Sequence, residues 1–435
     1  MGFSKVQDRK RDSEPLACAN EISSAEAIRN LNRQQVFDAL RQNAPISRRE
    51  LVDLVPLSRA TVSSIVKEMT ESGIVQEVGR AASTGGRRPI LLGYRPEAKL
   101  AVGVTMFDDS IKAVLTDLEG EPVRFLERKS SGLYTEELIR EMIDTVDELC
   151  GSIERRRVLG LGAGLPGVVD VDRGLIMEHI SRGRSIGAPI EARQMFEESL
   201  GMPSVISNRS RAAVLGEMQH GVAKGYHNVL YLFIGRGIVA SIVINGDIFF
   251  GPSFSAGELG HTTVVPEGLL CGCGNRGCLD MYSSESALVA RAIAAARGLP
   301  DSIMRSMVHG GNLQLLSSDH VVKAAQLGDA AAIEALDETG RFLGIALSSA
   351  INLLNPELLI LGGPIGCTTG RLLIEPVRRE IERHTLSIPL SVLDIVSGSE
   401  ETKSAAIGAA VLALKGAPIE AIFAPCDPEC IELGI

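Results

Sequence analysis

The sequence predicts an α/β protein in two parts, a short unit of three helices and a β-hairpin followed by a larger domain of alternating strands and helices. The hydrophobic period is helical over most of residues 24–73, and from about Lys99 short apolar runs alternate with amphipathic segments. The charge changes at the same place. Residues 1–95 carry 15 basic and 11 acidic side chains, whereas residues 96–435 carry 29 and 43. A basic unit on an acidic body indicates a nucleic-acid contact confined to one end.

The composition excludes several classes of protein. The 435 residues contain no tryptophan, and no apolar run approaches the roughly 20 residues that a membrane helix needs. The N-terminus is charged and lacks the apolar core of a secretory signal. We therefore expect no membrane span and a cytoplasmic protein at the bacterial nucleoid.

The first unit is expected to span residues 23–95, after a disordered tail over residues 1–22. Apolar residues recur at helical spacing over residues 24–42. Ser47 stands three positions before Glu50, which is the spacing of a capping box, and a second, short helix is predicted from that point.

A third helix and a hairpin complete this unit. Ser58 is the predicted N-cap of the third helix, and Gly73 is the expected residue just past its end. Strand-like runs at 74–78 and 89–94 then flank a loop, 79–88, that is rich in glycine and arginine. Three helices followed by such a hairpin predict a winged helix-turn-helix with this loop as the wing.

A helix-turn-helix places its second helix in the major groove of DNA, with the first residues of that helix near the base edges. Arginine suits guanine, hydroxyls suit bases or phosphates, and arginines on a wing suit the minor groove or phosphates. The alternative is a small helical subdomain with solvated arginines. The predicted DNA-binding residues are Ser47, Arg48, Arg49, Ser58, Arg59, Thr61, Ser63, Lys67, Arg87 and Arg88.

The larger domain is expected over residues 99–435, in two lobes. Strands are predicted at 100–106, 111–117 and 158–164, with an amphipathic helix at 136–150.

Three of the eight cysteines cluster within this domain. His261, Cys271, Cys273 and Cys278 form a set of one imidazole and three thiols, which is typical of a closed, structural Zn²⁺ site. The interleaved glycines are expected to let the backbone turn tightly enough for the cysteines to reach one ion. Free thiols in a glycine-rich turn, or a redox pair, are the alternatives.

Several motifs of this domain together resemble the ROK family, which groups repressors, open reading frames and kinases. With the N-terminal winged helix, nearly the whole chain is similar to the repressor branch. The motifs are GLPGVVD (164–170), SNRSRAAVLGE (207–217), the stretch 234–246, GELGH (257–261), CGCGNRGCLD (271–280) and LGGPI (361–365).

The resemblance implies an actin-like, ribonuclease-H-like fold of two lobes, with a sugar between them and a zinc loop at 257–280. It implies sugar contacts from Asn208, Glu258, His261 and Asp280, and His261 would also bind the metal. The family usually has glutamate where this chain has Asp280, so that contact has a shorter side chain here. Without the resemblance to this family, Glu258 and Asp280 would be interpreted as ordinary acidic residues in loops.

The resemblance also predicts that kinase chemistry is lost. The family's catalytic aspartate is replaced by Arg209, which cannot act as a base. The first phosphate loop, normally Asp-x-Gly-Gly-Thr, reads Thr-Met-Phe-Asp-Asp at 105–109, and the Gly-Thr-Gly loop reads Gly-Arg-Gly around Arg236. The competing prediction is an active sugar kinase with an accessory N-terminal domain.

We therefore expect a DNA-binding regulator, acting as a repressor of carbohydrate genes, whose sugar or sugar-phosphate effector changes its affinity for operator DNA. A homodimer or tetramer is expected, because paired recognition helices meet paired half-sites. Another alternative is a scaffold released from DNA by a membrane transporter subunit. Five arginines suggest that the effector is an anion: Arg182, Arg184, Arg209, Arg211 and Arg236. The alternative is that these arginines pair with acidic side chains such as Asp108 and Asp109.

Overall fold

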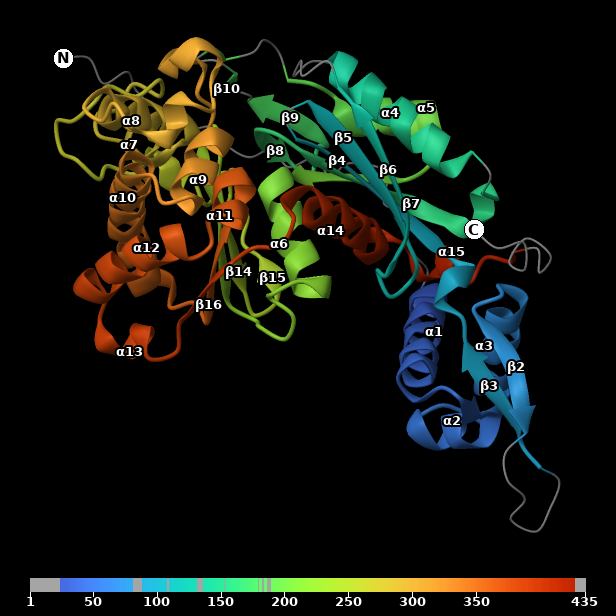
Figure 1. Cartoon of the computed structure of the whole chain (residues 1–435). Helices are drawn as coiled ribbons and strands as arrows, with labels where there is room; N and C mark the ends of the chain where they lie inside the picture. The colour runs from blue at the N-terminus through green and yellow to red at the C-terminus, as the bar shows by residue number, and fades with distance from the viewer. Residues whose placement is uncertain are drawn as a thin grey trace, which may run out of the picture. The chain divides into compact units, whose positions relative to one another are not determined.

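A computed structural model describes the protein over residues 24–80, 88–107, 109–130, 136–151, 153–178, 180–181, 184–185 and 189–426. The expected tail at 1–22, most of the wing and Asp108 lie outside these residues. The chain divides into two compact units, drawn in Figure 1. The first unit joins the N-terminal part, up to Arg95, with Pro418–Pro425. Of the described residues, the second unit contains those from Pro96 to Ala417 and Cys426.

The first unit has the helices and the hairpin that the sequence predicts. Its three-stranded sheet has the order β1-β3-β2, with all neighbours antiparallel. Ser47 and Glu50 form the predicted capping box, and Ser58 caps the third helix. The elements are α1 (Ser24–Asn43), β1 (Ile46–Ser47), α2 (Arg48–Leu54), α3 (Arg59–Glu71), β2 (Val75–Arg80), β3 (Ile90–Tyr94) and α15 (Ile419–Ile422).

The C-terminal segment belongs to the core of this first unit, although the sequence analysis placed it in the larger domain. The Phe37 ring, on α1, packs edge-on against Tyr94 and Phe423, with ring centroids 5.9 and 6.3 Å apart. The Arg33 guanidinium lies over the Phe423 ring at 5.6 Å. Phe423 is 5% exposed. The segment that contains Phe423 therefore packs on α1, and the unit is built from two distant parts of the sequence.

The second unit contains two five-stranded mixed sheets. The first sheet has the order β12-β7-β4-β5-β6, and the second has the order β15-β14-β13-β16-β17. Their strands are β4 (Leu100–Phe107), β5 (Ser110–Thr116), β6 (Pro122–Lys129), β7 (Val158–Leu165), β12 (Ser204–Asn208), β13 (Val229–Ile234), β14 (Ile238–Ile244), β15 (Asp247–Ile248), β16 (Leu358–Gly362) and β17 (Asp394–Ser397). Shorter pairs are β8 (Val168–Asp170) with β9 (Leu175–Glu178), and β10 (Ile180–Ser181) with β11 (Arg184–Ser185).

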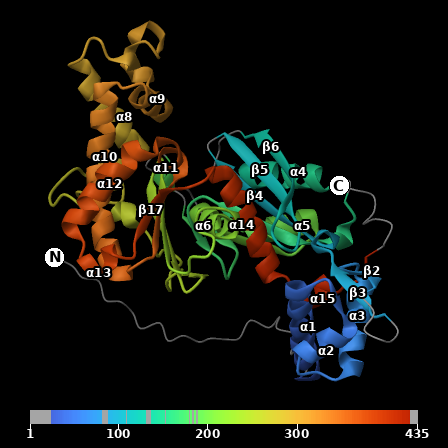
Figure 2. The same cartoon turned by 60° about the horizontal axis from the view of Figure 1, so that its bottom comes forward.

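Helices cover both faces of these sheets (Figures 1 and 2). On the first sheet, α4 and α5 pack on one face, and α14 with α6 on the other. On β13 the alternate residues Leu230, Leu232 and Ile234 face the core that α8, α10 and α12 share, whereas Tyr231 and Phe233 face α6 and α14. The helices are α4 (Glu136–Cys150), α5 (Ala192–Leu200), α6 (Arg209–His220), α7 (Asp280–Ser283), α8 (Glu285–Arg297), α9 (Ser318–Gln326), α10 (Ala330–Leu354), α11 (Gly363–Thr369), α12 (Arg371–His384), α13 (Ser387–Leu390) and α14 (Glu401–Gly416).

Glycines allow α14 to lie unusually close to its neighbours. A Cβ added at Gly162 on β7 would be 1.7 Å from the Ala409 carbonyl oxygen, and one at Gly103 on β4 would be 1.9 Å from that of Ala406. Backbone in direct contact with backbone leaves no room for side chains, which explains why small residues dominate this layer.

The strands and the helix predicted at 100–106, 111–117, 136–150 and 158–164 are present to within one residue at each end. Within the described part of the chain, every helix is too short or too polar to cross a membrane.

Candidate functional site

The exposed start of α3 is the candidate DNA-contacting surface. Val62, Ile65, Val66 and Met69 bury one side of this helix in the core of the first unit. The opposite side, with Arg59, Ser63 and Lys67, is exposed, and Thr61 is half-buried. The Ser58 hydroxyl accepts from the Thr61 amide at 3.1 Å and lies 2.9 Å from the Thr61 hydroxyl. The apolar side fixes the helix, and the polar side, on which Lys67 lies 3.6 Å from Glu71, faces solvent.

The other predicted DNA contacts fall into different environments. Arg48 and Arg49 are exposed at the start of α2, and Arg48 lies 3.8 Å from Glu77. Ser47 is only 3% exposed, and its hydroxyl donates to Glu50 at 2.7 Å, so its role here is to cap α2. Arg88 is exposed, and Arg87 lies outside the described residues.

One carboxylate ties α3 to α1. Glu68 accepts from Arg29 at 2.7 Å and from Arg33 at 2.9 Å. Partial burial would raise the pKa of Glu68, but the two guanidinium groups outweigh it and hold the pKa below its ordinary value. Glu68 therefore stays charged near neutral pH and fixes the helix that presents the exposed face.

The four predicted metal ligands come together in the second unit. All four ligand atoms of His261, Cys271, Cys273 and Cys278 lie within 4.8 Å of one another. The Sγ atoms of Cys273 and Cys278 are 3.7 Å apart, as are the Cys271 Sγ and the His261 Nδ1. Tetrahedral ligands with Zn–S bonds of about 2.3 Å have sulfurs about 3.8 Å apart. The donor set and its spacing therefore fit one tetrahedral ion.

Two glycines let this loop turn tightly, but the glycine between the first two cysteines is not one of them. Gly272 has no left-handed φ, and a Cβ there would meet open space. Gly274 and Gly277 adopt φ of +91° and +76°, and a Cβ on Gly277 would be 1.7 Å from the Val265 carbonyl oxygen. The expectation about interleaved glycines thus holds for Gly274 and Gly277, because only there does the backbone require it.

A hollow of about 460 Å³ lies beside the four predicted metal ligands. His261 and Asp280 line it, together with Arg236 and the N-terminal turn of α8 at Ser284 and Ser286. The Asp280 carboxylate accepts from the Ile238 amide at 2.8 Å, and burial raises the pKa of this carboxyl above its ordinary value. His261 and Asp280, two of the four predicted sugar contacts, therefore share one concave surface with the cationic side chain of Arg236.

The other two predicted sugar contacts, Asn208 and Glu258, do not line this hollow. Asn208 is the N-cap of α6: its side-chain oxygen accepts from the Ser210 amide at 2.8 Å, and its NH₂ donates to the Gly167 carbonyl at 2.6 Å. Glu258 begins the short helix Leu259–His261 and is half-buried.

Arg211 supports the loop that leads to Glu258. Its Nη2 donates to the carbonyls of Phe254 and Ala256 at 2.7 and 3.2 Å, and its guanidinium lies over the Phe250 ring at 5.0 Å. The side chain is 4% exposed, and its Nη1 has no hydrogen-bond partner among the described residues. Burial lowers the pKa of Arg211, and the charge of Glu258 opposes that shift.

Arg209 occupies an aromatic clamp. Its guanidinium carbon is 4.8 Å from the centroid of the Phe107 ring and 4.7 Å from that of the Phe233 ring. Its Nη1 donates to the Met106 carbonyl at 3.2 Å. Phe107 ends β4 in the first sheet and Phe233 lies on β13 in the second, so one cation joins the two sheets. The sequence predicts an anion or a carboxylate as the partner of Arg209, and the two aromatic rings are a different finding.

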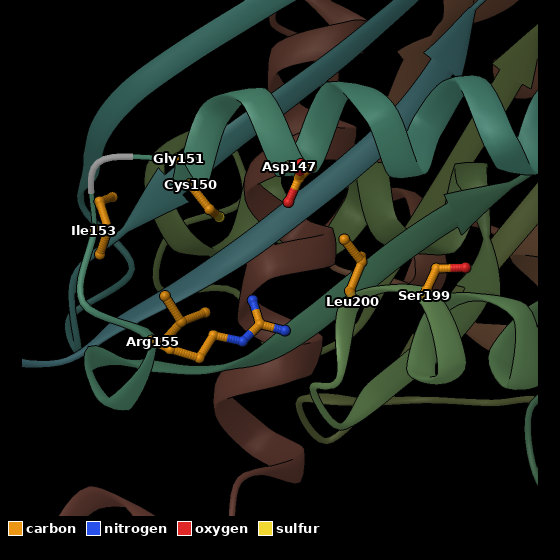
Figure 3. Close-up of a pocket in the computed structure, with 8 residues that line it drawn as sticks. Asp147, Cys150, Gly151, Ile153, Arg155, Ser199 and Leu200 are labelled. Carbon is orange, nitrogen blue, oxygen red and sulfur yellow. The ribbon is translucent and has the colours of Figure 1, made fainter.

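A second hollow, of about 280 Å³, lies where α4 and α5 end (Figure 3). Asp147, Cys150 and Arg155 line it, and none of the predicted site residues does. Burial raises the pKa of the Cys150 thiol to about 11, so this thiol is protonated at neutral pH.

Comparison with known proteins agrees with this architecture. Residues 101–416 match the ROK family, and residues 29–76 match a winged helix-turn-helix DNA-binding domain. The chain belongs to the ROK family. This ROK protein is 30% identical to the xylose repressor of Bacillus subtilis, over 84% of its own length and 90% of that protein. It is 29% identical to the N-acetylglucosamine repressor of Escherichia coli O6:H1, over 90% and 94% of the two chains.

Solved structures of the same family share the fold. A ROK family transcriptional regulator, a homologue of the E. coli MLC protein, aligns with a TM-score of 0.75 at 23% identity, over 91% of this chain and 99% of that one. A ROK glucokinase from Streptomyces griseus, solved with glucose and AMPPNP, aligns with a TM-score of 0.65 at 27% identity, over 73% and 100%. The winged-helix and actin-like fold class predicted from the sequence is confirmed.

Proposed function

We propose that this ROK protein is a DNA-binding transcriptional regulator, acting as a repressor of carbohydrate genes, and that it senses a sugar without phosphorylating it. The observation that carries the proposal is Arg209. The resemblance to the family puts this cation, which lies between two aromatic rings, at the position of the catalytic aspartate, and a guanidinium cannot accept a proton at neutral pH. The curated relatives named above are repressors, which supports the DNA-binding part.

In this proposal α3 enters the major groove, and Arg59 is the main candidate for reading a guanine. Arg48, Arg49 and Arg88 contact phosphates and set the orientation of the unit on DNA. Ser58, Thr61, Ser63 and Lys67 complete the surface. The protein acts as a dimer in the cytoplasm, since a two-fold operator needs two recognition helices.

The sugar is proposed to bind at the hollow beside the metal ligands. His261 and Asp280 offer donors and acceptors for sugar hydroxyls, and Glu258 and Asn208 approach on closure of the site. Arg236 in the same hollow makes a sugar phosphate the second candidate effector. A structural Zn²⁺ held by His261 and the three cysteines would fix the loop that carries these groups, and it would supply no reaction step.

The proposal is tested with the full-length protein and genomic DNA fragments that it selects. Release of a selected fragment is measured by fluorescence anisotropy against a library of neutral sugars and their phosphates, and ADP formation is measured with ATP and the same sugars. We expect one sugar or its phosphate to release DNA and none to be phosphorylated. Turnover of ATP with any sugar would overturn the proposal, as would DNA binding that no sugar changes.

Two variants separate the two halves of the molecule. Arg59→Ala should weaken binding of the selected fragment about 10- to 100-fold, the loss of one good base contact of about 1–3 kcal/mol, and leave sugar binding intact. Asp280→Ala should weaken sugar binding and leave binding of the selected fragment intact. An Arg59→Ala protein that binds the fragment as tightly as the parent would refute the placement of α3 in the groove.

A further inference from the structure

The hollow beside the four predicted metal ligands has a polar part and an apolar part. The polar part is formed by His261, Asp280 and Arg236, with the hydroxyl side chains of Ser284 and Ser286. The apolar part, which we call the apolar wall, is formed by the side chains of Leu269, Met281, Ala287 and Ala290. None of the described residues that line the hollow is aromatic. A ligand that fills both parts therefore combines hydroxyl groups with an apolar group.

In the polar part, a glycine leaves space beside one oxygen of the Asp280 carboxylate. The Oδ1 atom accepts a hydrogen bond from the Ile238 amide at 2.8 Å. A Cβ added at Gly237 would be 3.7 Å from the Oδ2 atom, its nearest contact outside the adjoining residues. Because Gly237 has no side chain, there is room beside Oδ2 for a hydroxyl group, from which a carboxylate oxygen accepts a hydrogen bond.

The apolar wall stands on backbone that is already fixed. The Leu269 amide donates to the Tyr282 hydroxyl at 2.9 Å, and the Leu269 carbonyl accepts from the Gly277 amide at 2.8 Å. The Leu269 side chain is nevertheless 53% exposed. Ala287 and Ala290 are three residues apart on α8 and therefore share one face of this helix, where Ala287 is half-buried and Ala290 is exposed. A ligand that covers the wall would bury apolar surface without first ordering a loop.

A free sugar fits only the polar part of the hollow. The volume of about 460 Å³ lies within the roughly 300–1,000 Å³ of pockets that take drug-sized ligands. Sugar hydroxyls placed on the apolar wall would lose their hydrogen bonds to water, and leucine and alanine side chains offer neither a donor nor an acceptor in exchange. An alkyl or aryl group in the same place loses no hydrogen bonds, and it leaves water for an apolar surface.

We propose that the effector is a glycoside, whose sugar hydroxyls bind at the polar part of the hollow and whose alkyl or aryl substituent packs on the apolar wall. Asp280 and His261 hold the sugar, and the apolar wall selects the substituent. The inference rests on the proposed function, because it takes this hollow to be the sugar site. It adds the chemical class of the effector, which differs from a free sugar and from a sugar phosphate.

The test titrates the full-length protein with matched methyl and phenyl glycosides of glucose, galactose, mannose and xylose in a calorimeter. For a sugar that binds, we expect the phenyl glycoside to bind about tenfold more tightly than the methyl glycoside, because it buries more apolar surface. Leu269→Ser and Ala290→Glu should bring the two affinities to within about twofold of each other, since each change places a polar group in the apolar wall. In the DNA-release assay, the phenyl glycoside should act at the lower concentration.

Two changes outside the hollow, Leu270→Ser and Ala294→Glu, are the matched controls. Leu270 is 59% exposed and adjacent to Leu269, and Ala294 is exposed one turn further along α8 than Ala290. Neither residue lines the hollow, so both variants should keep the preference for the phenyl glycoside. Circular dichroism checks that every variant is folded. Asp280→Ala should weaken the binding of both glycosides, which ties the substituent to the same site.

Equal affinity of the parent protein for the methyl and phenyl glycosides overturns this inference and leaves the sugar-sensing regulator in place. A preference that both variants of the apolar wall retain also overturns it, because the substituent then binds elsewhere. If no sugar and no glycoside binds, the proposed sugar site fails and the inference fails with it. Loss of the preference in the two wall variants, but not in the two controls, supports the glycoside.

Discussion

Replacing Arg209 with alanine should destabilise the second unit markedly. The change removes two cation–π contacts, at 4.8 and 4.7 Å, and one hydrogen bond to the Met106 carbonyl. Each cation–π contact contributes about 0.5–2 kcal/mol depending on desolvation, and a hydrogen bond from a charged donor about 1.5–3 kcal/mol. Because these contributions overlap, we expect the free energy of unfolding to fall by about 2–4 kcal/mol.

The assay is equilibrium urea unfolding of the full-length chain, followed by far-ultraviolet circular dichroism. Arg209→Lys keeps the charge but not the flat guanidinium that lies between two rings, so we expect it to lose about half as much. Arg297→Ala, at the exposed end of α8, is the control and should change the free energy by less than about 0.5 kcal/mol. A loss for Arg209→Ala no larger than that of the control would refute the view that this cation joins the two sheets.

Three further predictions concern charge, backbone and metal. The pKa of Glu400 is lowered from 4.5 to about 2, mainly by the hydrogen bond from the buried Lys112. The ion pair of Glu400 with Lys112 therefore stabilises the fold fully above pH 4.5, and this stabilisation is lost as the pH falls toward 2. Glu400→Gln should therefore flatten the acid-unfolding curve over that range, and an unchanged curve would contradict the ion pair. Gly257→Ala places a Cβ 1.9 Å from the Ala240 carbonyl oxygen at a φ of +98°, so thermal unfolding should show a loss of about 1–3 kcal/mol, and a neutral result would mean that the loop is free to move. Cys278→Ser should abolish the retention of metal by the purified protein, measured by mass spectrometry. Full retention would exclude a metal site in which Cys278 is one of four ligands.

The sequence predicted the local features of this protein well, because they depend on neighbours in the chain. Ser47 with Glu50, Ser58 and Gly73 mark helix ends through contacts that span three or four residues. The clustering of His261 with Cys271, Cys273 and Cys278 was also predictable, since the three cysteines lie within one loop.

Contacts between distant segments could not be predicted in the same way. Phe107 and Phe233 meet Arg209 from two different sheets, and nothing in the motif around Arg209 specifies aromatic partners. Phe423 packs on Phe37 across almost the full length of the chain, which no periodicity reveals.

The return of Pro418–Pro425 to the first unit has a consequence for the order in which the protein folds as it is made. The chain enters the second unit after Arg95 and comes back to the first unit after Ala417. Phe423, which packs on Phe37, is therefore synthesised after residues 96–417 of the second unit. Domains at the N-terminus generally fold first during synthesis. We expect this first unit to be an exception that completes its core only once the whole second unit has been synthesised.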